Sequence, residues 1–234
     1  MIVNNVNESL KRVLDIIFST GLLLLFSPFF IATAVLIKLN SKGPIFYSQE
    51  RLTKHERPFR ILKFRTMPVD AEKCSGPLWA SEEDGRTDLL GNFLRLTRID
   101  ELPQLINILK GDMSLIGPRP ERACFVEKFK TQGLPYYECR HAIRTGWMSY
   151  SHVVHPNLAI EQIASRTESD LYYIANWSIG LELWIVKAVF CMAFPIALKS
   201  FQMVWIQLIS MPRGVWGKLF PNIPAYLPNT AFDE

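Results

Sequence analysis

The sequence predicts an α+β protein, mostly helical, with an N-terminal re-entrant membrane helix, a small β-hairpin and interfacial amphipathic helices. Three observations support this class. The run at 16–37 carries no charged residue, and the stretches at 45–47 and 59–67 have the composition of strands. Several later stretches repeat apolar residues at helical spacing. A chain of 234 residues, 49% of them hydrophobic, is long enough for one domain of ordinary size plus a membrane element.

The uncharged run at 16–37 is long enough to cross a bilayer as one helix, so the simplest interpretation is a single-span anchor. Ser27 and Pro28, near its middle, favour another interpretation. Proline removes a backbone donor and clashes with the preceding turn, so we expect a kink there. The serine hydroxyl is expected to help satisfy the carbonyl groups that the kink frees. Ser27 and Pro28 are therefore predicted to break the membrane helix.

Positive charge flanks this run on both sides. The nearest basic residues are Lys11, Arg12, Lys38 and Lys42. Basic residues mark the cytoplasmic flanks of membrane segments, so both ends are predicted to lie on the cytoplasmic face. A helix that enters the bilayer, breaks and returns to the same face satisfies both observations. Asp15 is expected to pair with Lys11 or Arg12, or to reach the interface, because an unpaired carboxylate in lipid is costly.

The strand-like stretches at 45–47 and 59–67 are separated by a polar connection at 53–57 and are predicted to pair as a hairpin. The second stretch carries Lys63 and Arg65. Two interpretations of these cations stay open, namely an ordinary basic strand face and a pair of cations beside an active site.

The stretch at 95–120 contains a predicted amphipathic helix. Its apolar residues at i, i+3, i+4 and i+7 predict a buried stripe made of Leu102, Leu105, Ile106 and Leu109. Asp100 stands at a good N-cap position, and Glu101 favours the positive end of the helix dipole. Gly111 follows as a C-terminal stop.

Arginines surround these two carboxylates. Arg95 and Arg98 come just before them, and Arg119 follows the helix between two prolines. Carboxylates among arginines suggest a site that handles phosphate together with a divalent metal. The alternative is structural: Asp100 is only an N-cap, Glu101 only a first-turn residue, and the arginines a solvated basic face.

Two blocks of this stretch resemble the signature of a known family. They are Ile-Asp-Glu-Leu-Pro-Gln-Leu at 99–105 and Lys-Gly-Asp-Met-Ser-Leu-Ile-Gly-Pro-Arg-Pro at 110–120. They resemble the bacterial sugar transferases, monotopic phosphoglycosyl transferases, in the small form without an extra N-terminal membrane domain. The block at 63–67 and the Ser-Pro break are similar to the same family. The resemblance covers most of 11–187.

The resemblance implies transfer of a phosphosugar from a nucleotide diphosphate sugar, expected to be UDP-linked, to undecaprenyl phosphate. It implies Asp100 as the nucleophile that forms a covalent phosphosugar intermediate, Glu101 as its partner, and Mg²⁺ held partly by Asp100. The implied phosphate-binding residues are Lys63, Arg65, Arg95 and Arg119. It also implies the bacterial inner membrane, with the catalytic domain on the cytoplasmic face, and the first step of exopolysaccharide, O-antigen or glycoprotein glycan assembly. A homodimer is left open.

The sequence departs from the family at two connections. At 51–58, Thr53 and Glu56 stand where the family usually has glycines, which predicts a differently shaped loop. At 141–150, only the Thr-Gly-Trp at 145–147 matches. Donor-sugar specificity is therefore left open. His152 and His155 could share a helical face, but one such pair is weak evidence for a metal site.

The remaining segments complete the predicted organisation. A helix is expected at 121–130, a polar loop at 69–88 and an irregular tail at 212–234. The apolar stretch at 181–211 is predicted to form interfacial helices, because Glu182, Lys187, Pro195 and Lys199 interrupt it; a second buried or spanning helix is the alternative. The chain thus divides into 1–42, the catalytic part at 43–180, 181–211 and the tail, which act as one functional unit.

Two other classes of protein remain as alternatives. One is a non-catalytic membrane scaffold of a glycan-assembly complex. The other is a single-span protein whose basic domain recruits an acidic partner, as the net charge of +4 would allow. No nucleic acid is expected as a partner, because the chain shows no reader motif. The four cysteines show no paired spacing that would indicate a disulfide framework.

Overall fold

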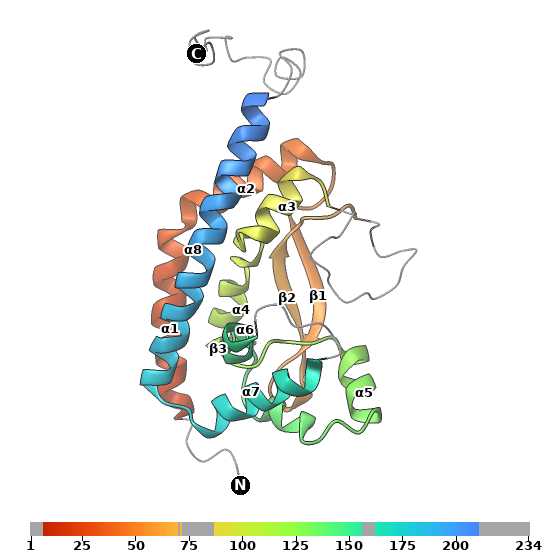
Figure 1. The fold of residues 1–234 in the computed structure, drawn as a ribbon, viewed down its shortest axis with the longest axis vertical. Coiled ribbons are helices and arrows are strands. Elements are labelled where there is room, and N and C mark those ends of the chain that lie inside the picture. The colour runs from red at the N-terminus through yellow and green to blue at the C-terminus, as the bar shows by residue number, and fades with distance from the viewer. Residues whose placement is uncertain (1–6, 70, 72–86, 156–161, 211–234) are drawn as a thin grey trace, which may run out of the picture.

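The computed structural model describes residues 7–69, 71, 87–155 and 162–210, and only the backbone of 194 and 196–210. The helices are α1 (Glu8–Leu25), α2 (Ser27–Asn40), α3 (Leu89–Leu96), α4 (Gln104–Lys110), α5 (Ala123–Thr131), α6 (Tyr150–Val154), α7 (Ile163–Ala175) and α8 (Ile179–Ser210). The strands are β1 (Phe46–Leu52), β2 (Pro58–Phe64), β3 (Ser114–Ile116) and β4 (Gly146–Met148). Short 3₁₀ turns are η1 (Lys54–Glu56), η2 (Ile99–Glu101) and η3 (Tyr137–Ala142). The predicted α+β class is confirmed (Figure 1). Most of the loop predicted at 69–88, namely 70 and 72–86, and the tail predicted at 212–234 lie outside the described residues.

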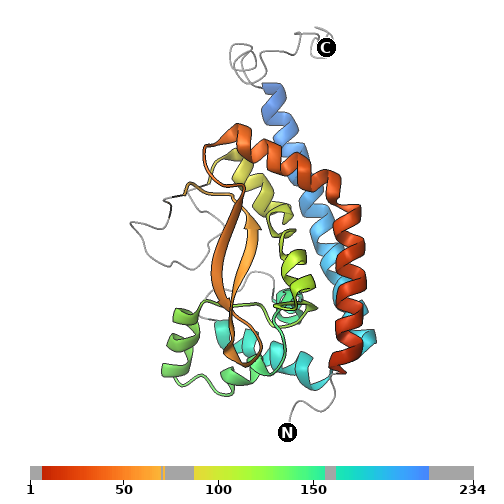
Figure 2. The same ribbon diagram turned by 180° about the vertical axis from the view of Figure 1, so that it is seen from behind.

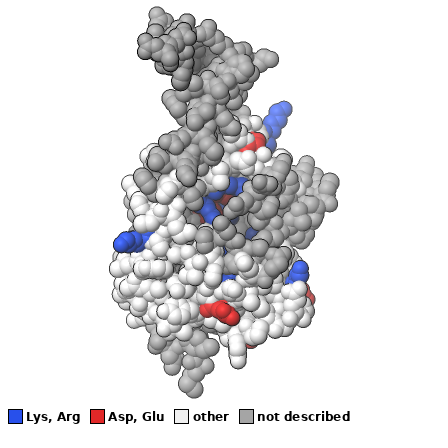
Figure 3. Space-filling view, viewed as in Figure 1, with Lys and Arg blue, Asp and Glu red and all other residues white. Residues whose placement is uncertain are grey.

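The polar face of α1 is buried and its apolar face is exposed. The side chains of Lys11, Asp15 and Ser19, one turn apart, are the buried ones of this helix. The exposed apolar side chains of α1 are Leu10, Val13, Ile16, Ile17, Phe18, Leu24 and Leu25. α8 runs alongside α1 (Figures 1 and 2), and the surface over the two helices is largely uncharged (Figure 3). This arrangement is the reverse of a water-facing helix, which hides its apolar stripe.

The N-terminal helix breaks at the predicted position. The axes of α1 and α2 differ by 60°, and α2 begins at Ser27 with Pro28 in its first turn. Within the described residues, no single helix is long and apolar enough to cross a membrane. The bent pair α1–α2 meets that requirement of length and composition when taken together.

Polar contacts join α1 to the rest of the fold. Arg12 donates hydrogen bonds to the last carbonyl groups of α4, one of them to Leu109 at 2.7 Å. Asp15 follows neither expectation from the sequence: it makes no ion pair with Lys11 or Arg12, and it is buried, with 1% of its surface exposed. It accepts hydrogen bonds from the Ser114 hydroxyl and the Leu115 amide of β3, each at 2.9 Å. Lys11 instead forms an ion pair with Glu182 of α8. α1 is therefore a structural support for β3 and α4.

The predicted hairpin is confirmed. β1 and β2 pair antiparallel, with Phe46 opposite Phe64 and Leu52 opposite Pro58. Phe30 of α2 packs on this sheet, with ring centroids 4.8 Å from Phe64.

The connection between β1 and β2 keeps one glycine-like feature. Glu56 has a φ of 56°, in the left-handed region where the family's glycine is the usual residue. Thr53 is buried, and its hydroxyl donates a hydrogen bond to the Asp112 carbonyl at 2.6 Å. The loop thus replaces a flexible glycine by a threonine that ties the hairpin to the end of α4.

Two features of the fold differ from the sequence-based expectation. β3 and β4 form a parallel pair that the sequence did not predict. The prediction of several helices at 181–211 is wrong, because residues 179–210 form one helix, α8, with Pro195 inside it. Glu and Lys are good helix formers, so Glu182, in the first turn of α8, and Lys187, further along it, do not interrupt the helix.

The main core lies where the hairpin, α4, β3, α7 and α8 meet. Its fully buried members include Phe64, Leu105, Ile108, Tyr173 and Ile185. α5 agrees with the helix predicted at 121–130 and covers a smaller core. The acidic pair is attached to the main core through α4.

Candidate active site

The acidic pair lies in η2, the 3₁₀ turn between α3 and α4. Asp100 and Glu101 are 6% and 5% exposed. Asp100 is not the N-cap that the sequence suggested, because α4 begins only at Gln104, after Pro103. Gly111 ends α4 with a φ of 88°, as predicted.

The buried stripe of α4 also differs from its prediction. Leu102 and Leu105 are buried as expected, but the next buried apolar residue is Ile108, while Ile106 and Leu109 are only partly buried. Residues three apart are also neighbours on one face of an α-helix, so Leu105 and Ile108 share the buried face of α4.

Three cations face one oxygen of Glu101. Its Oε1 lies 2.8 Å from Lys63 Nζ, 3.2 Å from Arg119 Nη2 and 3.6 Å from Arg98 Nη1. Lys63 Nζ is also 3.8 Å from Asp100 Oδ2. The second strand of the hairpin and the Pro-Arg-Pro segment thus bring two of the predicted cations to the acidic pair. Figure 3 shows basic and acidic atoms together in a recess of the surface.

The two carboxylates are held in different electrostatic states. Burial raises the pKa of Asp100 to about 6, with Lys63 opposing and Glu101 adding to the rise. Burial acts on Glu101 in the same direction, but the neighbouring cations outweigh it and hold the pKa of Glu101 well below its usual range. At neutral pH both groups are therefore mainly ionised, and Asp100 is the more basic of the two.

Asp100 keeps one oxygen available. Among the described residues, no group donates a hydrogen bond to Asp100 Oδ1, although the atom is buried. An orphaned carboxylate oxygen inside a protein is costly, and such groups concentrate at functional sites. One oxygen of Asp100 is therefore without a hydrogen-bond donor, while the neighbouring Glu101 holds the cations.

The two other predicted cations, Arg95 and Arg65, differ in how they relate to the acidic pair. Arg95, at the end of α3, is half-buried, and its charge lowers the pKa of Asp100. α3 comes close to the hairpin because Gly91 contacts the Thr66 carbonyl; an added Cβ would lie 2.2 Å from that oxygen. Arg65 is directed elsewhere, with hydrogen bonds to the carbonyl groups of Ser41 and Lys42 at 3.0 and 2.7 Å. Its role in binding phosphate stays a prediction.

The donor groups of this site fit a magnesium ion shared with a substrate. Mg²⁺ prefers oxygen ligands and is commonly held by one or two carboxylates together with waters and substrate phosphates. Asp100 is a carboxylate of this kind, with Lys63 3.8 Å from its Oδ2, whereas Glu101 is engaged by cations. Within the described residues, no group of three acidic, histidine or cysteine side chains could form a protein cage for a metal. The residues therefore fit a metal held by Asp100 and phosphate oxygens.

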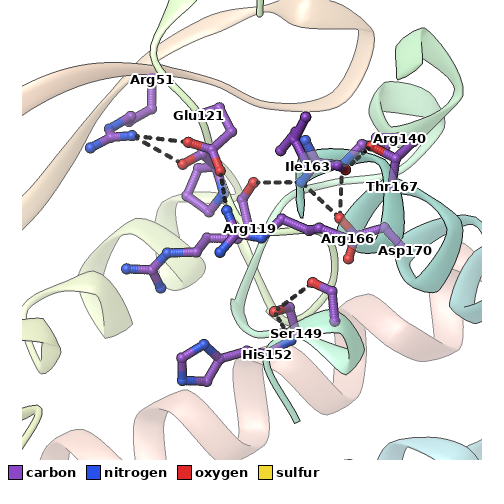
Figure 4. A network of polar contacts seen from close by, with 12 residues as sticks. Arg51, Arg119, Glu121, Arg140, Ser149, His152, Ile163, Arg166, Thr167 and Asp170 are labelled. Carbon is purple, nitrogen blue, oxygen red and sulfur yellow. Dashed lines mark hydrogen bonds and ion pairs between the residues drawn. The ribbon is translucent and has the colours of Figure 1, made fainter. Parts of the chain in front are cut away.

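A network of charged side chains lies behind Arg119 (Figure 4). Arg140 donates to Asp170 Oδ2 at 2.7 Å, and both side chains are 1% exposed. The same guanidinium donates to the carbonyl oxygen of Arg119 at 3.3 Å. Glu121 accepts a hydrogen bond from Arg166 at 2.9 Å.

Arg51 of the hairpin completes this network. Its guanidinium lies 3.6 Å from Glu121 Oε2 and donates to the Pro120 carbonyl at 3.3 Å. The Pro-Arg-Pro backbone is therefore fixed from the hairpin and, through Arg140, from η3. Fixing this backbone aims Arg119 at Glu101.

Two residues of this site have no role predicted from the sequence. In the sequence, Arg98 is only one of the arginines near the acidic pair, and His152 is half of a weak metal motif. Arg98 Nη2 lies 3.0 Å from His152 Nε2. Burial, followed by the charges of Arg98 and Arg119, lowers the pKa of His152 to about 4, so its imidazole is neutral. The one signal for Arg98 was its place two residues before Asp100; His152 had none.

The fold and this acidic pair among cations are those of a known class of protein. The model of the bacterial sugar transferase family matches residues 6–194. The chain belongs to this family.

Curated relatives give the same class with different sugars. The chain is 46% identical over 178 residues to a UDP-N-acetylgalactosamine-undecaprenyl-phosphate N-acetylgalactosaminephosphotransferase of Aeromonas hydrophila, covering 76% of this chain and 42% of that protein. It is 38% identical over 186 residues to a UDP-glucose:undecaprenyl-phosphate glucose-1-phosphate transferase of Escherichia coli, covering 78% and 40%. An exopolysaccharide production protein of Rhizobium leguminosarum is 37% identical over 186 residues, covering 76% and 91%. The matched region thus spans about two fifths of the first two relatives and most of the third.

Proposed function

We propose that this chain is a phosphoglycosyl transferase. It moves a phosphosugar from a nucleotide diphosphate sugar to undecaprenyl phosphate through a covalent aspartyl-phosphosugar intermediate. The observation that carries the proposal is Asp100, whose buried Oδ1 has no hydrogen-bond donor among the described residues, while Lys63 lies 3.8 Å from its other oxygen, Oδ2. A non-catalytic scaffold gives no reason to keep such an oxygen buried.

The first half-reaction uses Asp100 as the nucleophile. Its Oδ1 attacks the phosphorus attached to the sugar, and a new O–P bond forms. The bond from that phosphorus to the bridging oxygen breaks, and the nucleoside monophosphate leaves with the electron pair. Because the pKa of Asp100 is about 6, the carboxylate is mainly ionised at pH 7 and needs no base.

The second half-reaction restores the enzyme. An oxygen of undecaprenyl phosphate attacks the same phosphorus, the bond to Asp100 breaks, and the carboxylate returns with its electron pair. The attacking phosphate is already an anion, so proton transfer is not required. Lys63 and Arg119 stabilise the charge that builds on the phosphoryl oxygens. Magnesium at Asp100 would supply positive charge that offsets the repulsion between carboxylate and diphosphate.

The proposed location is the cytoplasmic face of the bacterial inner membrane, with α1 and α2 as the re-entrant helix. The exposed apolar faces of α1 and α8 support it, because apolar surface of this extent favours lipid over water. The 60° bend and the basic residues at both ends of the pair support entry and return on one face. A site at the interface lets a lipid phosphate meet a water-soluble donor.

The proposed donors follow from the relatives. Those of Aeromonas hydrophila and Escherichia coli are named for UDP-N-acetylgalactosamine and UDP-glucose, so UDP-linked sugars are the first donors to test. The Rhizobium leguminosarum relative is named for exopolysaccharide production, which supports initiation of such a polymer.

The test measures nucleoside monophosphate released by the purified full chain with undecaprenyl phosphate, Mg²⁺ and a panel of UDP-sugars. We expect release that needs both the lipid phosphate and the metal, and that disappears in Asp100→Asn. A radiolabelled sugar should stay attached to the protein when the lipid is omitted. Release that survives Asp100→Asn would contradict the nucleophile assignment, and a chain inactive with every donor would favour the scaffold.

A further inference from the structure

Arg98 has an unusual backbone conformation. Its φ is 59° and its ψ 13°, in the left-handed region that non-glycine residues rarely adopt. This conformation lies at the junction between α3 and η2. Strained conformations of this kind persist where the surrounding structure over-determines them, and they cluster at functional sites. The conformation sets the direction of the Arg98 side chain immediately before the acidic pair.

Contacts made by α6, the helix that carries His152, fix the position of this residue. The Ser149 hydroxyl accepts a hydrogen bond from the His152 amide at 3.2 Å and caps α6. Tyr150 of the same helix stacks on Tyr172 with ring centroids 5.3 Å apart. α6 is therefore packed against α7, and through the contact of Tyr150 with Trp184 against α8. In Figure 4 the side chains of His152 and Arg119 extend to the same side of the network.

The contact between Arg98 and His152 has a defined direction. A guanidinium can only donate, so His152 Nε2 must be the acceptor across the 3.0 Å, with its proton on Nδ1. The same guanidinium is 3.6 Å from Glu101 Oε1. His152 therefore holds Arg98 beside Glu101 without neutralising the charge of the arginine.

The positive charge at this point exceeds what the carboxylates balance. Glu101 Oε1 already has Lys63 at 2.8 Å and Arg119 at 3.2 Å. Arg98 is the outermost of the three, with 45% of its side chain exposed against 31% for Arg119 and 24% for Lys63. A third cation that is more exposed than the other two, and that is held by a neutral partner, suits an anion that arrives from solvent.

We propose that Arg98 binds the diphosphate of the nucleotide-sugar donor, and that His152 is the positioning residue that holds Arg98 in place for it. The proposal rests on the proposed transferase function. The proposal assigns a function to α6, which follows the connection at 141–150 where the sequence departs from the family: it holds His152 beside Arg98. His152 acts by limiting the motion of a long side chain before the donor binds, which lowers the entropy lost on binding.

The test compares the kinetics of four single variants and one double variant of the full chain in detergent, at saturating lipid phosphate and Mg²⁺. Arg98→Ala is expected to raise the KM for the UDP-sugar about tenfold and to lower kcat at pH 7 by less, because Arg98 also lowers the pKa of Asp100. His152→Phe is expected to raise the KM for the UDP-sugar about fivefold with kcat nearly unchanged. His152→Gln still offers an acceptor oxygen and should keep a KM close to wild type. His155→Ala, at the end of the same helix, is the matched control.

The double variant shows whether His152 acts through Arg98. Arg98→Ala with His152→Phe should be no worse than Arg98→Ala alone, because the positioned group is already missing. Additive losses would overturn the proposal. So would a His152→Phe variant with a lower Tm or kcat and an unchanged donor KM, which is the result of a purely structural role.

A binding measurement separates this proposal from the proposed function. Calorimetry with UDP and Mg²⁺ needs no turnover. If the wild-type chain releases no nucleoside monophosphate, the transferase proposal fails; weaker UDP binding by Arg98→Ala than by His155→Ala would still support a diphosphate site at Arg98. Equal UDP affinities in wild type and Arg98→Ala would overturn the proposal whatever the activity.

Discussion

The hydroxyl of Ser27 donates a hydrogen bond to the carbonyl oxygen of Leu24 across 2.8 Å. In an unbroken helix that carbonyl would bond to the amide of residue 28, which is proline and has none. The serine thus replaces the hydrogen bond that its neighbour removes, so the break is not left with an unsatisfied polar group in an apolar setting.

Ser27→Ala is therefore expected to destabilise the protein by about 1 kcal/mol, or about 2–4 °C in apparent Tm. Ser27→Thr keeps the hydroxyl and should lose less. Thermal unfolding in detergent measures both variants, with Thr20→Ala as the control, since Thr20 is exposed on the same helix. An equal loss of stability in Thr20→Ala and Ser27→Ala would show that the hydrogen bond from Ser27 to Leu24 does not stabilise the break.

Lys63→Met should shift the pH dependence of turnover. The charge of Lys63 lowers the pKa of Asp100 from where burial would place it, so its removal raises that pKa above about 6. A larger fraction of Asp100 is then protonated at pH 7 and cannot attack. We expect a lower kcat and an acid limb of the pH–activity profile displaced to higher pH, while Lys128→Met, exposed on α5, leaves the profile unchanged. An unmoved acid limb would contradict the assignment.

Asp170→Asn should be strongly destabilising. It leaves the guanidinium of Arg140, 1% exposed, without its charged partner, which costs about 3–5 kcal/mol. Replacing both residues, as Arg140→Met with Asp170→Leu, should recover at least half of the loss because no buried charge remains. Arg57→Gln removes an exposed ion pair with Asp112 and should change stability by less than about 1 kcal/mol. Chemical unfolding in detergent provides the comparison.

Stability should fall as the pH drops from 7 to 5, and His141 should account for part of the fall. Burial, together with the charge of Arg140, lowers the pKa of His141 to about 4 from an ordinary 6.5. The unfolded chain therefore binds a proton between these two values that the folded chain does not, so protonation favours unfolding as the pH falls through this window.

His141→Gln removes this site and should reduce the loss between pH 7 and 5 by about 2 kcal/mol. His155→Gln, which changes a partly exposed histidine, should not. The measurement is the apparent free energy of unfolding of the wild type and of each variant at pH 7 and at pH 5. A pH dependence identical in wild type and His141→Gln would show that His141 does not contribute.

Local patterns in the sequence predicted the elements whose signals are local. The hairpin, the break at Ser27 and the glycine stop at Gly111 each depend on residues within a few positions of one another. The β3–β4 pair joins two strands of three residues that are far apart in the chain, and such short strands have no period to detect. Pro195 suggested a break in α8 because proline breaks most isolated helices, yet the helix continues through it.

The residues of the site also divide into those that local sequence patterns predicted and those that they did not. Asp100, Glu101 and Arg119 belong to continuous motifs, and Lys63 comes from a neighbouring strand; contacts now join all four. Arg98 and His152 are 54 positions apart, and their pairing depends on a left-handed backbone and a capped helix that no spacing reveals. Arg65 was expected to bind phosphate, but its guanidinium is engaged by the end of α2.

The hydrogen bonds from β3 to Asp15 fix the distance between the active site and the bend at the end of α1. β3 leads directly into the Pro-Arg-Pro segment, so the helix and the acidic pair share one rigid frame. Each helical residue adds about 1.5 Å, which places the bend at Ser27 about 18 Å along α1 from Asp15, a little more than half of a hydrocarbon core of about 30 Å. Under the proposed membrane placement, the length of this one helix sets how far above the lipid the reaction takes place. Four residues added between Asp15 and Ser27 would move the bend by about 6 Å without altering a single catalytic side chain.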